Sequence, residues 1–69
     1  MIIGQLWHPG RQQLWHPTKS PIGVSNLPDP YSGSVPHVMY ETEVYRVEDA
    51  YIDTAKRLAK CGFDGVELH

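Results

Sequence analysis

Histidine has the widest chemical use of any side chain in this sequence, because near neutral pH its imidazole ligates metals, transfers protons or donates hydrogen bonds. The chain of 69 residues contains four of them, His8, His16, His37 and His69. The spacing of the first three fits no compact zinc motif, and only one cysteine, Cys61, is available to join them. A metal site is therefore not expected.

Two of these histidines lie in a repeated motif, Gln-Leu-Trp-His-Pro, at residues 5–9 and again at 13–17. Only the first copy follows an apolar run and is followed by Gly-Arg. The second is flanked by polar residues and prolines. Architectures built from repeats use periods of roughly 20–50 residues in three or more copies. We therefore interpret the first copy as the end of a strand and the second as part of a loop that Trp15 helps to pack.

Composition excludes several classes of protein. The net charge is −2 and no basic run is present, so neither a nucleic acid nor an anionic membrane is an expected partner. No apolar stretch is long enough for a signal peptide or a membrane span, and the single cysteine rules out an internal disulfide. These features predict a cytoplasmic protein.

The hydrophobic pattern predicts a strand at about residues 1–7 and a second at about 65–69, separated by a long loop and a helix. The loop, residues 8–40, holds all six prolines, which exclude a long helix or a central strand there. The helix, residues 42–61, has one apolar stripe. Its members are Val44, Val47, Tyr51, Ala55, Leu58 and Ala59.

The ends of the helix have recognisable signals. Thr42 is one plausible N-cap, and Tyr40 followed by Glu43 would supply half of a capping box. Gly62 is the residue expected to end the helix, because glycine adopts positive φ without steric cost. Cys61 beside it has no histidine base nearby in the sequence, so we expect a packed thiol and not a nucleophile.

A strand that returns through a helix forms a parallel unit of an α/β protein, and such a unit leaves the outer edges of both strands open. A loop of this length is uncommon in a compact domain, and the strand pattern is still running at His69. We therefore interpret the chain as a fragment whose packing partners lie in further sequence.

Strand alternation sorts the side chains into two faces. The face expected beneath the helix is apolar and consists of Ile2, Leu6, Val66 and Leu68. Gln5, Glu67 and His69 point to the opposite side, which in a closed barrel is the interior, where the carboxyl ends of strands form the site. A lone inward carboxylate is costly, so we expect Glu67 to pair with Arg11.

Three segments together resemble the Old Yellow Enzyme family: GQLWHPGR at 4–11, VPHVM at 35–39 and CGFDGVELH at 61–69. Members of that family are FMN-dependent NAD(P)H:flavin oxidoreductases and ene-reductases built on a TIM (β/α)8 barrel. The resemblance covers essentially the whole chain. It implies a βαβ fragment running from the third to the fourth strand of the barrel, as one partial domain.

The resemblance implies roles for three residues. Gln5 matches the glutamine that binds the pyrimidine edge of the flavin, and an amide offers the donor and acceptor that this edge requires. Trp7 matches a position that lines the substrate pocket. His69 matches a catalytic residue that hydrogen-bonds the carbonyl or nitro oxygen of a small-molecule substrate and polarises its alkene toward hydride from reduced flavin.

The rest of the family's site has no counterpart within these residues. The second member of the histidine pair, the tyrosine proton donor and the FMN phosphate site all lie beyond position 69, so the isolated chain is expected to be inactive. One alternative is a small non-catalytic α/β module that binds a partner or a metal through its histidine-containing loop. Another is a stand-alone protein that dimerises to complete its sheet.

Overall fold

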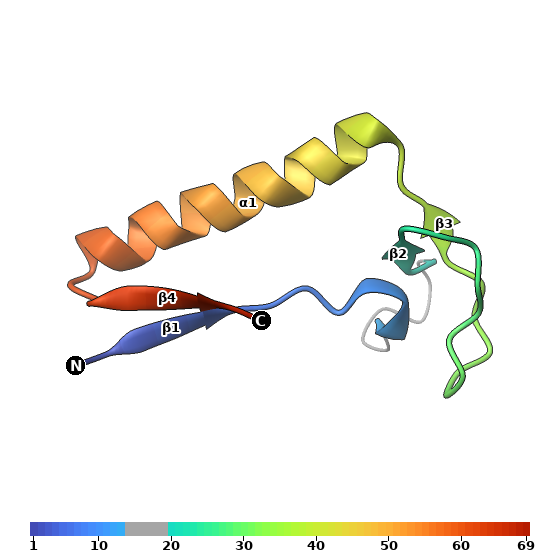
Figure 1. Cartoon of the computed structure of the whole chain (residues 1–69), viewed down its shortest axis with the longest axis horizontal. Coiled ribbons are helices and arrows are strands. Elements are labelled where there is room, and N and C mark those ends of the chain that lie inside the picture. The colour runs from blue at the N-terminus through green and yellow to red at the C-terminus, as the bar shows by residue number, and fades with distance from the viewer. Residues whose placement is uncertain (14–19) are drawn as a thin grey trace. The chain divides into compact units, whose positions relative to one another are not determined.

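The computed structural model describes residues 1–13 and 20–69, which contain strands and one long helix (Figure 1). These residues form two compact units, one of Met1–His8 with Glu43–His69 and the other of Pro9–Thr42. The elements in chain order are β1 (Ile3–Leu6), the 3-10 helix η1 (Gly10–Gln12), β2 (Ile22–Gly23), β3 (His37–Val38), α1 (Glu41–Lys60) and β4 (Gly65–Leu68).

In the first unit, β1 and β4 lie side by side and run parallel, with Ile3 opposite Gly65 and Leu6 opposite Leu68. A backbone hydrogen bond of 2.9 Å from His69 N to Leu6 O carries the pairing one residue past β4. Parallel strands require a crossover connection, and the connection enters β4 through α1, which runs along the strand pair (Figure 1). This arrangement belongs to the α/β class.

The helix and the turn after it lie close to β1 at Gly4. A Cβ atom placed on Gly4 would lie 2.5 Å from Cδ1 of Leu58 and 3.5 Å from Cδ2 of Phe63. A larger residue at position 4 would therefore displace the Leu58 side chain. The neighbouring Leu6 is buried with 6% of its surface exposed, as expected for the face beneath the helix.

Leu68 departs from the expected pattern. It was predicted to lie beneath the helix with Leu6, its register partner, but 72% of its surface is exposed. Leu68 is the last residue of β4, so few neighbouring side chains are available to cover it. Ile2 is also mostly exposed, which limits the apolar core of this unit to the region around Gly4 and Leu6.

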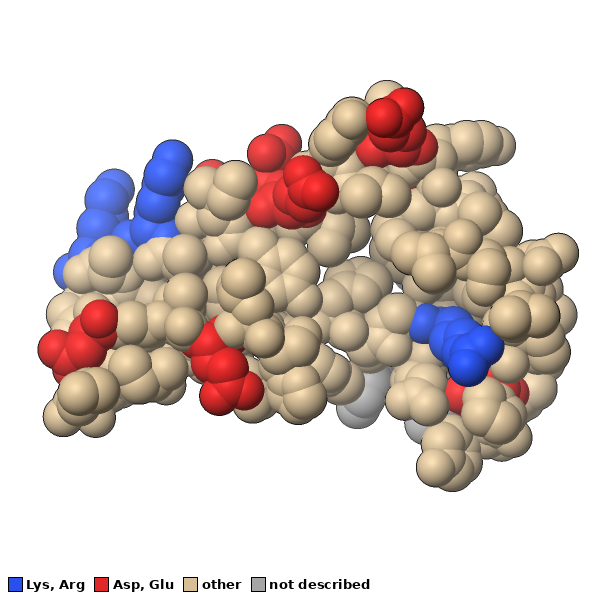
Figure 2. Space-filling model, in the orientation of Figure 1, with Lys and Arg blue, Asp and Glu red and all other residues tan. Residues whose placement is uncertain are grey.

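The helix presents its predicted stripe on its less exposed side. The partly buried stripe residues are Val44, Val47, Tyr51, Ala55 and Leu58. Ala59 was expected in the stripe but is exposed, and Thr54 is partly buried instead, with its hydroxyl donating to Ala50 O at 2.7 Å. Acidic and basic side chains occupy the outer surface of α1, with Arg57 and Lys60 in its last turn (Figure 2). Cations in the last turn stabilise the helix because they lie near the negative end of its dipole.

The two ends of α1 differ in how well the sequence signals them. The helix begins at Glu41, so Thr42 lies inside the first turn and the predicted cap at Thr42 is wrong. At the other end Gly62 has φ +91°, as predicted, and donates to Ala59 O at 3.1 Å. Phe63 N donates to Leu58 O at 3.0 Å, which completes a Schellman motif. This motif turns the chain directly into β4.

The second unit contains short regular elements inside the segment expected to be a loop. β2 and β3 pair in parallel, with Ile22 opposite His37, and His37 N donates to Pro21 O at 2.8 Å. Pro21 and Pro36 each precede a strand and are buried. Proline is tolerated at this position because its missing N–H does not interrupt the pairing. The prolines therefore limit these strands to two residues without excluding them.

No helix among the described residues is long and apolar enough to cross a membrane.

Candidate functional site

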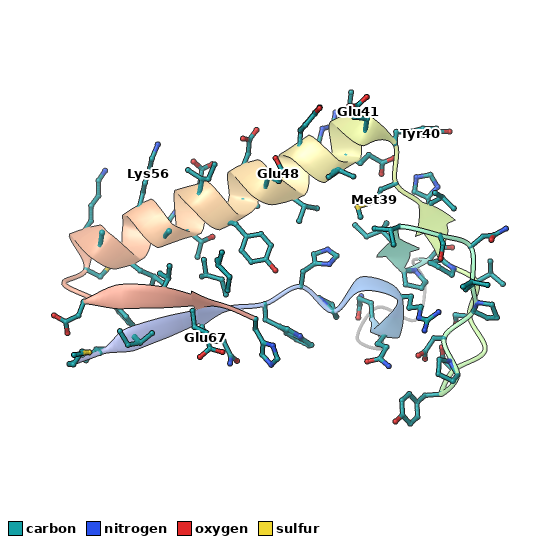
Figure 3. All side chains as sticks on the ribbon, in the orientation of Figure 1. Met39, Tyr40, Glu41, Glu48, Lys56 and Glu67 are labelled. Atoms are coloured by element: carbon teal, nitrogen blue, oxygen red, sulfur yellow. The ribbon has the colours of Figure 1, made fainter. Side chains whose placement is uncertain are left out.

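A polar pair lies on the face of the β1–β4 sheet opposite α1. Gln5 and Glu67 are Cα partners in the parallel register, and Nε2 of Gln5 donates to Oε1 of Glu67 at 3.0 Å. The Glu67 side chain projects from β4 away from α1 (Figure 3). The two residues are 62 positions apart in the sequence, so the fold and not local geometry brings them together.

The other two predicted site residues follow directly after the strands. Trp7 follows β1, and His69 follows β4 with its backbone N–H bonded to Leu6 O. Alternation continued past Leu6 and Leu68 would place Trp7 on the face of Gln5 and His69 on the face of Glu67. The two parallel strands thus bring an amide and a carboxylate together near their carboxyl ends, and an indole and an imidazole follow next in the chain.

The hydrogen-bonding capacity of this face is only partly used. A carboxylate accepts hydrogen bonds and donates none, so Glu67 fixes which end of the Gln5 amide faces it. The second Nε2 hydrogen and Oε1 of Gln5 have no partner within residues 1–13 and 20–69. The side chains of Gln5 and His69 are exposed, and Trp7 is 54% exposed. The amide therefore leaves one donor and one acceptor at the surface.

Glu67 has a different neighbour from the one expected. Its hydrogen-bond partner is Gln5, whereas the predicted partner Arg11 donates from Nη1 to Leu27 O at 3.4 Å within the second unit. A Glu67–Arg11 ion pair would join residues of different units and stays a prediction.

The structure describes three of the histidines, His8, His37 and His69. In the part of the chain that the structure describes, no three His, Cys, Asp or Glu side chains are grouped so as to hold a metal ion. His37 makes an edge-on aromatic contact with Tyr40, with ring centroids 5.5 Å apart. His16, Trp15 and most of the second Gln-Leu-Trp-His-Pro copy lie outside the described residues.

Cys61 is exposed, and its predicted packing as a buried thiol is wrong. The residue follows the last turn of α1 and precedes Gly62, where the chain leaves the helix. The Schellman motif directs Phe63, and not Cys61, toward the strand beneath. The thiol therefore remains at the surface.

The structure also shows a buried carboxylate that was not singled out from the sequence. Asp29 is 1% exposed, and its Oδ2 accepts hydrogen bonds of 2.9 Å from both the backbone N–H and the hydroxyl of Ser32. Gly33 N donates to the Asp29 backbone carbonyl at 2.8 Å, which closes the turn. The local signal was an Asp between two prolines followed by Ser and Gly, a composition typical of a side-chain-stabilised turn.

Two opposing effects act on the charge of Asp29. Burial works to raise its pKa, but the hydrogen bonds from Ser32, Tyr31 and Gln12 together outweigh burial and lower the pKa from its ordinary value of 3.8. Its other oxygen, Oδ1, is buried and has no hydrogen-bond partner among the described residues. The carboxylate is thus ionised at neutral pH and organises the turn of the second unit.

The sheet face resembles one quarter of a TIM-barrel site: two parallel strands whose carboxyl ends carry the polar groups. Comparison with known proteins identifies the family. Residues 1–69 match the NADH:flavin oxidoreductase / NADH oxidase family, and the chain belongs to it. Members of this family are TIM-barrel oxidoreductases that use FMN as cofactor and NADH as reductant. The resemblance drawn from the three sequence segments is confirmed.

Three curated relatives are similar along the chain. It is 34% identical over 74 residues to the NADH-dependent flavin oxidoreductase nadA of Aspergillus parasiticus, covering 100% of the chain and 17% of that protein. It is 33% identical to the flavin oxidoreductase hxnT of Emericella nidulans, over 100% of the chain and 20% of the relative. It is 31% identical to an NADH oxidase of Thermoanaerobacter brockii, over 99% of the chain and 11% of the relative. No solved structure matches the chain significantly.

Proposed function

We propose that this chain supplies part of the flavin and substrate site of an FMN-dependent oxidoreductase that reduces an activated alkene or a similarly electron-poor small molecule with NAD(P)H. The observation that supports the proposal is the pairing of Gln5 with Glu67 near the carboxyl ends of two adjacent parallel strands, which Trp7 and His69 directly follow. In a TIM barrel these ends form the active site.

Gln5 is the proposed flavin-binding residue. The pyrimidine edge of a flavin presents both carbonyl acceptors and an N–H donor, and Gln5 offers one N–H and one carbonyl oxygen that no described residue engages. The residues present therefore fit the cofactor. FMN, when bound, supplies hydride transfer from NAD(P)H, and the alkene gains that hydride at one carbon and a proton at the other.

His69 and Trp7 are the proposed substrate-binding residues. An imidazole N–H donated to a carbonyl or nitro oxygen stabilises the negative charge that develops there as hydride adds to the alkene, which makes His69 the catalytic residue of this segment. Trp7 offers a large aromatic side chain, and 54% of the residue's surface is exposed. Indole rings suit such positions because they bury much area with little loss of conformational entropy.

The 69 residues alone are not expected to hold FMN tightly or to catalyse. Small-molecule sites are concave and bury about 70–90% of their ligand. Here Gln5 and Glu67 lie on one face of a two-stranded sheet, and the side chains of Gln5, Glu67 and His69 are all exposed. The chain also spans between 11% and 20% of the curated relatives named above.

A hybrid enzyme provides the test: nadA with its matching segment replaced by residues 1–69. The proposal predicts that the purified hybrid contains FMN and oxidises NADH when an activated alkene is added. Gln5→Leu should weaken FMN binding about tenfold, as expected for the loss of hydrogen bonds worth about 1.4 kcal/mol. Folding of each variant is checked by circular dichroism.

The role of His69 is tested separately in the same hybrid. His69→Phe should lower kcat/KM on the order of a hundredfold, as for removal of one donor to a developing oxyanion, while FMN content stays unchanged. His69→Asn keeps an N–H donor and should recover part of the activity. Lys56→Gln is the matched control, because Lys56 projects outward from α1 (Figure 3). A folded hybrid that contains no flavin, or equal rates for all three variants, refutes the proposal.

A further inference from the structure

The hydrogen bond between Gln5 and Glu67 determines how the amide is presented. The donor is Nε2 of Gln5 and the acceptor is Oε1 of Glu67, at 3.0 Å. If the amide were rotated by 180°, its carbonyl oxygen would face a carboxylate that has no hydrogen to donate. The observed orientation is thus the one in which the amide can donate a hydrogen bond to the carboxylate.

The pair is also fixed by the backbone. Gln5 and Glu67 are exact Cα partners in the parallel register, flanked by Gly4–Val66 and Leu6–Leu68. Both side chains therefore leave the same face of adjacent strands at the spacing of neighbouring strands, about 4.8 Å. Their contact does not depend on a loop.

We propose that Glu67 is a positioning residue for the flavin. It holds the Gln5 amide in one orientation, so that the free N–H and the carbonyl oxygen of Gln5 remain directed to the ligand. This inference rests on the proposed function, because it assigns Gln5 to the cofactor. The new element is that Glu67 acts through Gln5, by accepting one hydrogen bond from it.

The charge of Glu67 has a second consequence. Reduction adds negative charge to the pyrimidine side of the flavin, and a carboxylate next to the residue that binds this edge disfavours the added charge. Glu67 is exposed, so solvent screens the effect and limits its size. Removing the charge should shift the flavin midpoint potential in the positive direction.

Two substitutions separate orientation from charge. Glu67→Leu removes both the acceptor and the charge at nearly constant volume. Glu67→Gln removes the charge but keeps an oxygen that can accept from Gln5 Nε2. Glu48→Gln is the matched control, because it removes one glutamate charge from an exposed position on α1 in the same unit (Figure 3).

The first measurement uses the full 69-residue chain and no flavin. Nitrogen–proton correlation spectra resolve the two Nε2 hydrogens of Gln5, which differ in shift even in a free amide because rotation about the C–N bond is slow. The hydrogen bound to Glu67 should resonate downfield of its position in a free glutamine. Glu67→Leu should return it to that position, and Glu48→Gln should leave its shift unchanged. Both Gln5 hydrogens at free-glutamine shifts in the unsubstituted chain would overturn the inference, since Glu67 would then hold no orientation.

The second measurement uses the hybrid enzyme. Glu67→Leu should weaken FMN binding about tenfold, the factor that corresponds to about 1.4 kcal/mol. Glu67→Gln should keep FMN affinity within about threefold and raise the midpoint potential. If Gln5→Leu weakens FMN binding while both Glu67 variants leave affinity and potential unchanged, the positioning role is wrong and the proposed function stands. If the folded hybrid binds no FMN, both are wrong.

Discussion

The close approach of α1 to β1 makes Gly4→Ala the most informative single change in the first unit. The added methyl group would lie 2.5 Å from Cδ1 of Leu58, well inside van der Waals contact. Overpacking of this kind costs about 1–3 kcal/mol, and a value of about 1.5 kcal/mol, in the lower half of that range, applies because the obstructing atom is the end of a partly exposed side chain. Alanine also lowers the entropy of the unfolded chain, worth about 0.5 kcal/mol in the opposite direction. We expect a net loss of about 1 kcal/mol.

The prediction is tested by measuring Gly4→Ala in a chain that also carries Leu58→Ala. With Cδ1 removed, the methyl group of Gly4→Ala meets no obstruction from that residue, so the same change should become neutral or stabilising by about 0.5 kcal/mol. The coupling between the two sites is then about 1.5 kcal/mol, and it is measured by a double-mutant cycle.

Thermal and urea unfolding of the 69-residue chain, followed by circular dichroism, report this coupling, since 1 kcal/mol corresponds to roughly 4–8 °C in Tm. Gly65→Ala is the matched glycine control, because its added methyl would approach only Ile3 Cδ1, at 3.2 Å. If Gly4→Ala costs the same with and without the Leu58 side chain, the packing explanation is incorrect.

Three further predictions concern the turns and the surface. Gly62→Ala should cost about 1–2 kcal/mol in unfolding free energy because φ is +91° there, and Gly62→Asn should cost less, as thermal unfolding will show. Asp29 has a lowered pKa, so its contribution to stability is fully present above the unfolded value near 3.8 and is lost as pH falls through the lower folded value. The amide resonance of Ser32 should therefore stay constant from neutral pH down to about 4 and move only in stronger acid, whereas Asp29→Asn should abolish this transition. The exposed Cys61 should react with a disulfide reagent in the native chain nearly as fast as in urea, and Cys61→Ser should change stability by less than about 0.5 kcal/mol.

Periodic patterns in the sequence predicted the elements of the first unit well. The apolar stripe of α1, the glycine at its end and the two flanking strands all follow from spacing and residue type. The start of the helix was misplaced because Thr42 is a good capping residue by type, yet the helix already includes it. Capping preference alone does not decide a boundary that the preceding segment also influences.

Short strands and buried polar groups were harder to predict. β2 and β3 have two residues each, too few for alternation to show, and the prolines around them argued for a loop. The burial of Asp29 depends on hydrogen bonds from Ser32, which only the folded turn provides. Likewise, alternation predicted that Gln5 and Glu67 share a face. Their direct pairing depends on the register between β1 and β4, which cannot be read from the sequence alone.

The parallel pairing of the first and last strands has a consequence for the order of folding. Gln5 and Glu67 are 62 residues apart, and closing a flexible loop of that length costs about 4 kcal/mol in chain entropy. Because α1 contains mainly local contacts, it can form before the loop closes, whereas the strand pair forms only on closure. During synthesis, the paired face that carries Gln5 and Glu67 therefore forms only after β4 has left the ribosome.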